Sequence, residues 1–511
     1  MSTELRRVTY GNHGVARLTP APDKPGTYMG MPKFSKAVKG ELNLSVQRKN
    51  MRNATTTIRN KRAMRVSESP DWQDLRDAAE SIKNRVGRHL DHYLVEAEKN
   101  LTANGVHVHW ARDGEEANRI VAQIVKDKGV DEVVKIKSIT SQETDLNEYL
   151  EAQGIAAWET DLAELIVQLG HDRPSHIVVP AIHRNRAEVR EIFLHEMKNY
   201  GRPAPEDISE NPPELANAAR LHLREKFLRA EMAVSGGNFV LADTGSLVIV
   251  ESEGNGRMCL TLPDTLVSIV GIEKVLPSFD DLEVFLKLLP RSATGERMNP
   301  YNSVWSGVTD GDGPQEQHVI FLDNGRTDVL ADTLGREVLR CIRCASCINI
   351  CPVYERAGGH AYGSVYPGPI GAVLNPQLRG VEHPVDRGLP YACSLCGACN
   401  EVCPVKIPFT DILLKLRNKV VESEKADRIP QDYEVAGEMG LMKTASWAFS
   451  DHKHFEAIQV GSRGVGRVLR GKKMGPVPVP VAERWLKYRD VDAPPADTFR
   501  TWWKKNREVQ R

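Results

Sequence analysis

Long hydrophobic runs are absent from this 511-residue chain. No stretch approaches the roughly 20 consecutive apolar residues that a membrane-spanning helix needs. The N-terminal residues, Met1-Ser-Thr-Glu-Leu-Arg-Arg, lead into polar sequence without the apolar core of a secretory signal. We therefore expect a cytoplasmic protein, either soluble or peripheral to a membrane.

Two nucleotide-binding motifs are also missing. No G-x-G-x-x-G opens a helix, and no G-x4-G-K-[ST] is present, so the sequence does not support a nicotinamide or ATP site of those kinds. No pattern indicates a flavin site either.

A net charge is missing as well, because 68 basic residues balance 68 acidic ones. The distribution is uneven: residues 1–65 carry 14 Lys/Arg against 3 Asp/Glu, residues 451–511 carry 14 against 7, and the middle carries 40 against 58. The basic ends either pack on their own chain or dock on an acidic partner or an anionic membrane surface. Nucleic acid is not expected, because neither end contains a recognised binding module.

Cysteine is nearly absent outside one segment, which holds eight of the nine. The exception, Cys259, lies in a strand-like run and is expected to be a small buried apolar residue. The eight form two copies of C-x2-C-x2-C-x3-C-P, the run that binds [4Fe–4S] clusters in bacterial ferredoxins. The first copy is Cys341, Cys344, Cys347 and Cys351, and the second is Cys393, Cys396, Cys399 and Cys403.

The spacing also predicts which cysteine binds which cluster. Three cysteines wrap one cubane, and the fourth, before a proline, points toward the other cubane. The predicted ligands are therefore Cys341, Cys344, Cys347 and Cys403 for cluster 1, and Cys393, Cys396, Cys399 and Cys351 for cluster 2.

Other uses of these cysteines fit less well. Disulfides need an oxidising compartment, and the sequence has no export signal. A zinc site usually pairs two C-x2-C units, whereas each run here holds four cysteines and ends in proline. Haem c needs a histidine directly after C-x2-C, and Ile348, Gly397 and Asn400 stand there instead. The sequence therefore predicts two [4Fe–4S] clusters. Arg340 and Arg343 bracket the first cysteine, and a positive charge there would stabilise the reduced cluster. His360, Tyr362 and Tyr366, in the turn-rich insert between the runs, either lie near a cluster or pack as ordinary loop residues.

The rest of the chain predicts an α/β fold. Residues 32–104 have helical periodicity, and a strand–helix alternation follows that is typical of a parallel sheet with helices on both faces. A long helix over 211–234 and a meander of strands make the predicted sheet mixed. Strands are expected at 106–110, 132–136, 155–158, 176–179, 238–242, 247–250, 257–262, 265–271 and 318–322, and the helices of the alternation at about 113–128, 142–153, 161–169 and 184–198.

Candidate residues outside the cysteines are few. Glu164 and His183 are placed to point into a cleft at the carboxyl ends of the strands. The run Asp243-Thr-Gly-Ser246 is either a hairpin turn or a polar site.

Four regions result. They are a basic N-terminal helical extension (1–65), an α/β domain (66–327), a helix-rich ferredoxin-like domain with two clusters (328–421) and a C-terminal region (422–511). The last contains an extended segment at 475–481 and an irregular, basic tail rich in tryptophan. This tail either anchors the chain to a partner or folds back on its own domain; the tryptophans after residue 446 are Trp447, Trp485, Trp502 and Trp503.

These features together resemble a known family. The runs Ile139–Glu148, Glu159–Gln168 and Ala242–Ser246 look like the lactate utilization (LUD) domain. Followed by the double cysteine run and the Trp-Trp tail, they make the chain similar to the lactate utilization protein B family over roughly residues 30–505.

The resemblance implies a function and partners. Its α/β domain would be similar to the sugar-phosphate isomerase and CoA-transferase fold. Members take part in oxidation of L-lactate to pyruvate, with a cysteine-rich companion protein and a second LUD-domain protein. This chain would be the non-catalytic subunit that carries electrons toward a respiratory acceptor, which is peripheral to the membrane or linked to quinone. The alternative is a catalytic subunit that binds lactate or glycolate in the LUD domain. The family supplies no agreed catalytic residues.

Overall fold

The computed structural model describes residues 7–8, 17–18, 31–333, 335–426, 433–468, 473–474, 491–495 and 497–507. The chain divides into two compact units, residues 1–420 and residues 421–511. Both large sheets and all nine cysteines lie in the first unit.

Helices follow one another from residue 34 to residue 103, as the periodicity predicts. In α3 the buried side chains recur at Trp72, Leu75, Ala79, Ile82 and Val86, which places them on one face. The four helices are α1 (Phe34–Glu41), α2 (Ser45–Ser67), α3 (Trp72–Arg88) and α4 (Leu90–Ala103).

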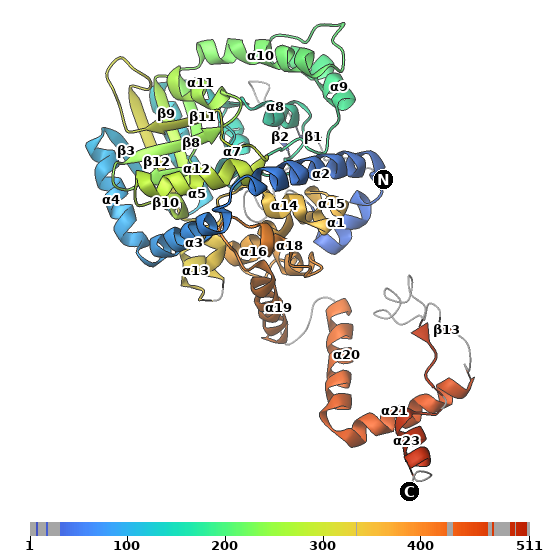
Figure 1. Ribbon diagram of the computed structural model, residues 1–511. Coiled ribbons are helices and arrows are strands. Elements are labelled where there is room, and N and C mark those ends of the chain that lie inside the picture. Colours follow the sequence, from blue (N-terminus) through green and yellow to red (C-terminus); the bar gives the residue numbers. More distant parts are fainter. Residues whose placement is uncertain are drawn as a thin grey trace. The chain divides into compact units, whose positions relative to one another are not determined.

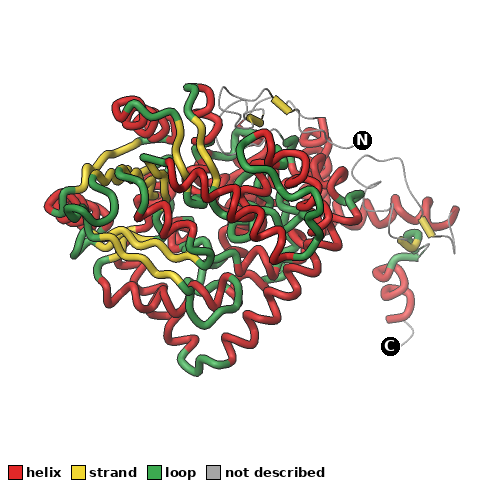
Figure 2. Tube along the Cα trace, turned by 90° about the horizontal axis from the view of Figure 1, so that it is seen from above, coloured by secondary structure: helices red, strands yellow, loops and turns green. Residues whose placement is uncertain are grey.

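A six-stranded parallel sheet forms the centre of the α/β part of the first unit, and the helices of the cysteine-rich segment lie to one side of it (Figures 1 and 2). Its central strand β9 is buried along its whole length, as expected of a sheet that is covered on both faces. Val267 and Ile269 pack toward α5, whereas Leu266 and Val270 pack toward the opposite face. The strand order is β3 (Val106–Ala111), β12 (Glu316–Leu322), β9 (Thr265–Gly271), β6 (Met232–Gly236), β4 (Glu132–Lys135) and β5 (Ala156–Glu159).

The helices between these strands are those of an α/β alternation, so the predicted fold class is confirmed. The predicted helix over 142–153 is divided in two, because Asp145 adopts a left-handed conformation with φ 51°. The helices are α5 (Gly114–Lys128), α6 (Ile139–Glu143), α7 (Leu146–Ala152), α8 (Leu162–Leu169), α9 (Arg186–Glu196) and α10 (Pro212–Arg229).

The remaining strands form a second sheet rather than one side of a single mixed sheet. β7 pairs in parallel with β10 and antiparallel with β8, which pairs antiparallel with β11. Helix α12 (Phe279–Ala293) lies between β10 and β11 in the chain. The four strands are β10 (Val275–Leu276), β7 (Phe239–Leu241), β8 (Ser246–Glu251) and β11 (Tyr301–Trp305).

Three predicted elements are wrong. Residues 257–261 belong to helix α11 (Asn255–Thr261) and Leu262 is its C-cap, because the Glu251 carboxylate accepts hydrogen bonds from the N–H groups of Gly256 and Arg257 in the first turn. The helix over 211–234 ends at Arg229, since residues 232–236 insert as a buried strand between β9 and β4. Residues 176–179 form bends, in which the His176 ring accepts two backbone hydrogen bonds.

The cysteine-rich segment is helix-rich, as predicted, and it packs against the N-terminal helices. Helix α2 contacts both α14 and α15 (Figure 1). The α-helices of the cysteine-rich segment are α13 (Arg326–Ala331), α14 (Ser346–Ile350), α15 (Pro352–Ala357), α16 (Gly368–Arg379), α17 (Pro384–Gly388), α18 (Ala398–Val402) and α19 (Phe409–Ala426).

After α19, the described residues of the second unit form three helices. They are α20 (Tyr433–Ser450), α21 (His452–Val468) and α23 (Phe499–Arg507), with short strands at Lys473–Met474 and Val491–Asp492. Trp502 and Trp503 on α23 are half-exposed, which leaves both interpretations of the tail open. The segment 475–481 and Trp485 lie outside the described residues. Within the described residues, no helix is both long enough and apolar enough to span a bilayer.

Candidate iron–sulfur centre

The repeat in the sequence is a repeat in the backbone. Arg343 and Leu395, each two residues after the first cysteine of its run, have φ values of 60° and 55°. The N–H of Arg343 donates to Cys341 Sγ at 3.4 Å, and the N–H of Leu395 donates to Cys393 Sγ at 3.3 Å. These left-handed turns aim amide groups at the sulfurs, and such inward-facing amides favour a negatively charged group.

The cysteine–proline pair that ends the first run begins a helix. Cys351 is the N-cap of α15, its Sγ accepts a hydrogen bond from the N–H of Tyr354, and Pro352 is the first helical residue. Proline is favoured there because the first N–H of a helix has no intrahelical partner.

Four cysteines from both runs surround one enclosed space. Cys341, Cys344, Cys347 and Cys403 line it, together with apolar residues that include Ile370 and Phe409. Burial and then the nearby Cys344 and Cys341 thiols raise the pKa of Cys403 to about 12.

The other four cysteines influence one another in the same way. The pKa of Cys399 is raised to about 12 by burial and then by Cys393, Cys351 and Cys396. The two groups, hereafter group 1 (with Cys403) and group 2 (with Cys351), each contain three cysteines of one run and the last cysteine of the other.

Neither group is arranged for a single metal ion. A tetrahedral zinc site with Zn–S bonds of about 2.3 Å places its thiolates about 3.8 Å apart. Across the described residues, the one set of three or more His, Cys, Asp or Glu whose ligand atoms all lie within 4.8 Å of one another contains no cysteine. The wider spacing of the sulfurs, with backbone amides that donate to Cys341 and Cys393, fits a cubane.

The two groups differ in exposure. All four cysteines of group 1 are buried, between 5% and 8% exposed. In group 2, Cys351 and Cys399 are buried, Cys393 is half-buried and Cys396 is exposed. Group 1 therefore lies inside the first unit and group 2 reaches its surface.

Cations from the N-terminal helices contact group 1. Arg62 of α2 donates to the carbonyl of Val402 at 2.9 Å, and Arg76 of α3 donates to the carbonyl of Cys403 at 2.9 Å. Burial lowers the pKa of Arg62, and the Cys344 thiol counteracts this change. Sequence reasoning missed both residues. The basic composition of residues 1–65 was the only signal for Arg62, and Arg76 lies beyond that region in a helical pattern that marks no ligand.

The two arginines beside Cys341 have different roles. Arg340 binds Asn84 and Glu80 and does not point at a sulfur. Arg343 is buried, and its Nη2 lies 3.2 Å from Glu273 Oε1. Its Nε and Nη1 have no partner among the described residues, so Arg343 can donate to a negatively charged cluster.

The structure shows the surroundings of the three candidates in the insert, Tyr362, Tyr366 and His360. Tyr362 is 1% exposed, its hydroxyl has no partner among the described residues, and burial followed by the Cys351 and Cys393 thiols raises its pKa. Tyr366 donates to Glu143, and Arg343 lies 4.8 Å over its ring. The His360 ring contacts Arg173 and Asp172 instead.

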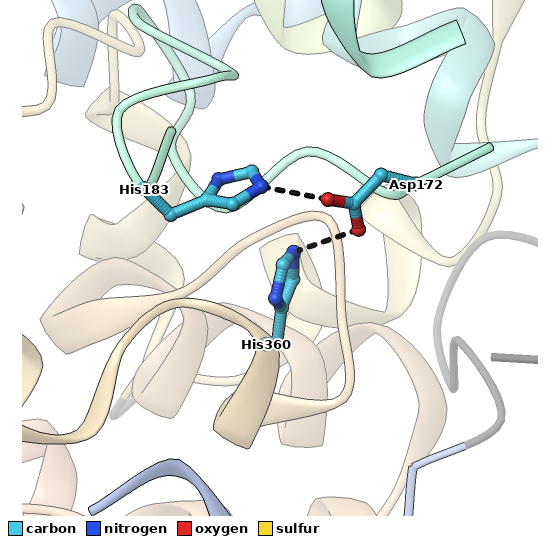
Figure 3. Close-up of side chains that lie close together, drawn as sticks. All are labelled: Asp172, His183 and His360. Atoms are coloured by element: carbon cyan, nitrogen blue, oxygen red, sulfur yellow. Dashed lines mark hydrogen bonds and ion pairs between the residues drawn. The ribbon is translucent and has the colours of Figure 1, made fainter. Parts of the chain in front are cut away.

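His360 joins a hydrogen-bonded junction between the LUD-like domain and the cysteine-rich segment (Figure 3). Its Nε2 lies 2.8 Å from the Arg173 carbonyl and 3.8 Å from Asp172 Oδ1. Asp172 Oδ2 lies 2.8 Å from His183 Nε2 and accepts from Arg184 at 2.6 Å. Although burial raises the pKa of Asp172, its hydrogen bond with His183 and the nearby charges lower it overall. The ligand atoms of Asp172, His183 and His360 lie within 4.8 Å of one another. Because the Arg184 cation already binds the Asp172 carboxylate, we expect a structural junction rather than a metal site.

The remaining candidates do not meet at one site. Asp243–Ser246 is the turn between β7 and β8, held by hydrogen bonds from Asn100 and Asn104. Glu164 accepts from Gln142 at 2.6 Å, and burial, with Glu159 and Asp161 nearby, raises its pKa to about 8.

Comparison with known proteins agrees with this arrangement. Residues 94–322 match the model of the LUD domain, and residues 337–407 match that of the 4Fe-4S dicluster domain. The chain is 40% identical to lactate utilization protein B of Bacillus licheniformis, over 94% of this chain and 98% of that protein. The chain belongs to the lactate utilization protein B family.

Other relatives agree with this membership. Lactate utilization protein B of Bacillus subtilis (strain 168) is 38% identical, over 94% of this chain and 98% of its own. The "uncharacterized electron transport protein YkgF" of Escherichia coli (strain K12) is also 38% identical, with the same coverage.

The predicted family, fold class and cofactors are confirmed. The chain combines a LUD domain with a ferredoxin-like domain for two [4Fe–4S] clusters, and its role is in lactate utilization and electron transport. The assignment of each cysteine to one cluster and the boundaries between the four regions stay predictions.

Proposed function

We propose that this chain is the electron-carrying subunit of an L-lactate-oxidising complex and that it works toward a respiratory acceptor. Its companions would be a cysteine-rich protein and a second LUD-domain protein. The names of its relatives, which refer to lactate utilization and to electron transport, support this proposal.

The observation that carries the proposal is the difference in exposure between the two cysteine groups. When bound, each cluster takes up or releases one electron at a time. Group 1, with Cys403, would hold the inner cluster, and apolar side chains such as Ile370 and Phe409 exclude water there. Group 2, with the exposed Cys396, would hold a cluster at the surface, where a partner protein can approach.

The surface loop of group 2 is built as a contact point. Arg417 of α19 donates to the carbonyls of Pro390 and Cys393 at 3.0 Å, and its guanidinium lies 5.4 Å from the centre of the Tyr391 ring. The Tyr391 side chain is half-exposed next to the loop. Arg417 thus fixes the loop from behind while its outer face stays open.

A second candidate function is binding of the hydroxy acid by the LUD domain. A cavity in that domain that adjoins group 1 favours it.

The test uses the full chain purified without oxygen. Wild-type protein is expected to hold about eight irons and Cys396→Ala about four. In a complex reconstituted with the two companions, Cys396→Ala should abolish lactate-dependent reduction of the acceptor, and Ser394→Ala, beside it on the loop, should not. Undiminished reduction with Cys396→Ala would contradict the proposal.

A further inference from the structure

A cavity of about 560 Å³ lies at the carboxyl edge of the parallel sheet. Its walls include the residues that follow three neighbouring strands: 136–140 after β4, 161–163 after β5 and 236–238 at the end of β6. Ligands of open α/β sheets bind at this edge, and the volume is in the range of sites for organic molecules.

The cavity shares a wall with cysteine group 1. Ile177, Ile342 and Arg343 line both the cavity and the space that Cys341 and Cys403 enclose. A molecule in the cavity would therefore be separated from cluster 1 by a single layer of side chains.

A buried lysine without a partner in the described part of the chain lines this cavity. Lys274 ends the short 3-10 turn Ile272–Lys274, is 5% exposed, and has no hydrogen bond or ion pair within the described residues. Burial and then the nearby Arg343 lower its pKa to about 7. A buried ammonium without a partner is costly, so an anion in the cavity would complete the site.

Two other cations that line the cavity, Lys137 and Arg343, each have a carboxylate partner. Lys137 lies 3.1 Å from Asp161 Oδ2. Arg343 binds Glu273 through Nη2 and keeps two donors free. The end of the cavity next to group 1 is therefore cationic.

We propose that this cavity binds an organic anion, a molecule with a carboxylate or phosphate and an apolar body, whose charged group pairs with Lys274 beside cluster 1. The inference deepens the proposed function and rests on it, because a ligand in this position is placed to exchange electrons with the inner cluster. The apolar side chains that line the cavity include Ile136, Ile166, Val179, Leu215, Ile249 and Leu289.

Two sources share this chemistry. One is the fuel itself, a 2-hydroxy acid, or its 2-oxo acid product. The other is a phosphate-bearing redox cofactor such as flavin mononucleotide, which the size of the cavity favours. A two-electron centre of the second kind would also connect a two-electron oxidation to one-electron clusters.

The test is calorimetric titration of anaerobic holoprotein with L-lactate, pyruvate and flavin mononucleotide in turn, with the EPR spectrum of reduced cluster 1 as a second readout. Lys274→Met should weaken binding about tenfold or more, because a charge-assisted hydrogen bond is lost. Lys274→Arg should restore it. Ala293→Phe, which reduces the space in the cavity, should block it.

Lys83→Met is the matched control. Lys83 is also buried near Cys341 and donates to the Glu273 carbonyl, but it does not line the cavity. Its substitution removes the same charge and should leave binding unchanged.

Each outcome decides the inference. Binding of lactate or pyruvate would identify the fuel, and binding of flavin mononucleotide the cofactor; either should alter the EPR spectrum of cluster 1. The inference is overturned when none of the three binds at millimolar concentration, or when Lys274→Met and Ala293→Phe bind as the wild type does. If a probe binds at Lys274 but Cys396→Ala still supports reduction of the acceptor, the proposed electron-carrying function is contradicted, whereas the assignment of the cavity stands.

Discussion

Arg76 Nε donates to the backbone carbonyl of Cys403 at 2.9 Å, and the two residues are 327 positions apart in the chain. The contact connects the first helices to the last cysteine of the second run. Arg62, one helix earlier, donates to Val402 in the same way. Arg62 of the basic N-terminal region thus packs on its own chain, and the charges of Arg62 and Arg76 both lie beside group 1.

Arg62→Gln is expected to lower the reduction potential of cluster 1 by tens of millivolts, because a positive charge near a cluster stabilises its reduced form. Glutamine can still donate to the Val402 carbonyl, so the fold should be retained. Redox titration monitored by EPR measures the change. Arg65→Gln, which removes a charge paired with Glu68 on the same helix, should leave the potential unchanged. Equal potentials in both variants would exclude Arg62 from this role.

The features that could be predicted from the sequence are those that depend on residues a few positions apart. The cysteine runs carry their ligand chemistry within eleven residues, and strand and helix periodicity predicted most of the α/β elements. Residues 257–262 show the limit: Met258 and Leu262 are partly exposed while Cys259 and Leu260 are buried. A carboxylate several residues upstream, on Glu251, caps the helix that they form.

Features made by distant segments could not be predicted in this way. Three examples depend on positions far apart in the chain. They are the place of Lys274 in the cavity, the cavity wall shared through Ile342, and the contact of His360 with Arg173. No local pattern marks them, because each residue type is ordinary in its own segment.

His360→Ala is expected to lower the free energy of unfolding by about 1–2 kcal/mol, since it leaves the buried Arg173 carbonyl without its hydrogen bond. Chemical denaturation measures this loss. His92→Ala, at an exposed position on α4, should have little effect. Iron content should stay unchanged in both. A stoichiometric extra metal in the wild type that His360→Ala removes would show that the junction is a metal site.

The raised pKa of Glu164 predicts that the folded chain becomes less stable as the pH rises. Its carboxyl ionises at a pKa of about 8 in the folded chain, because burial and nearby acidic groups disfavour the charge, and near 4.3 when unfolded. Between these values the folded chain holds a proton that the unfolded chain has released, so stability falls until the pH passes the folded pKa. Each unit of difference corresponds to about 1.4 kcal/mol.

Glu164→Gln should remove this dependence and melt at a higher temperature than the wild type at about pH 8.5, with less difference at about pH 5.5. Glutamine can still accept the hydrogen bond from Gln142. Thermal unfolding at the two pH values checks it, with the exposed Glu283→Gln as control. A pH dependence that persists in Glu164→Gln would assign the effect to another group.

Tyr362→Phe is expected to lower the reduction potential of cluster 2 and to leave that of cluster 1 nearly unchanged. The Tyr362 hydroxyl is buried, has no partner among the described residues, and is influenced most, after burial, by the thiols of Cys351 and Cys393. It is therefore available to donate to a cluster held by group 2, and such hydrogen bonds raise cluster potentials. Tyr354→Phe is the matched control, because the Tyr354 hydroxyl donates to the Ser175 carbonyl at 2.8 Å. The control should lose about 1 kcal/mol of stability and keep both potentials. A shift of cluster 1 instead would place the Tyr362 hydroxyl on group 1, and no shift in either cluster would show that it donates to neither.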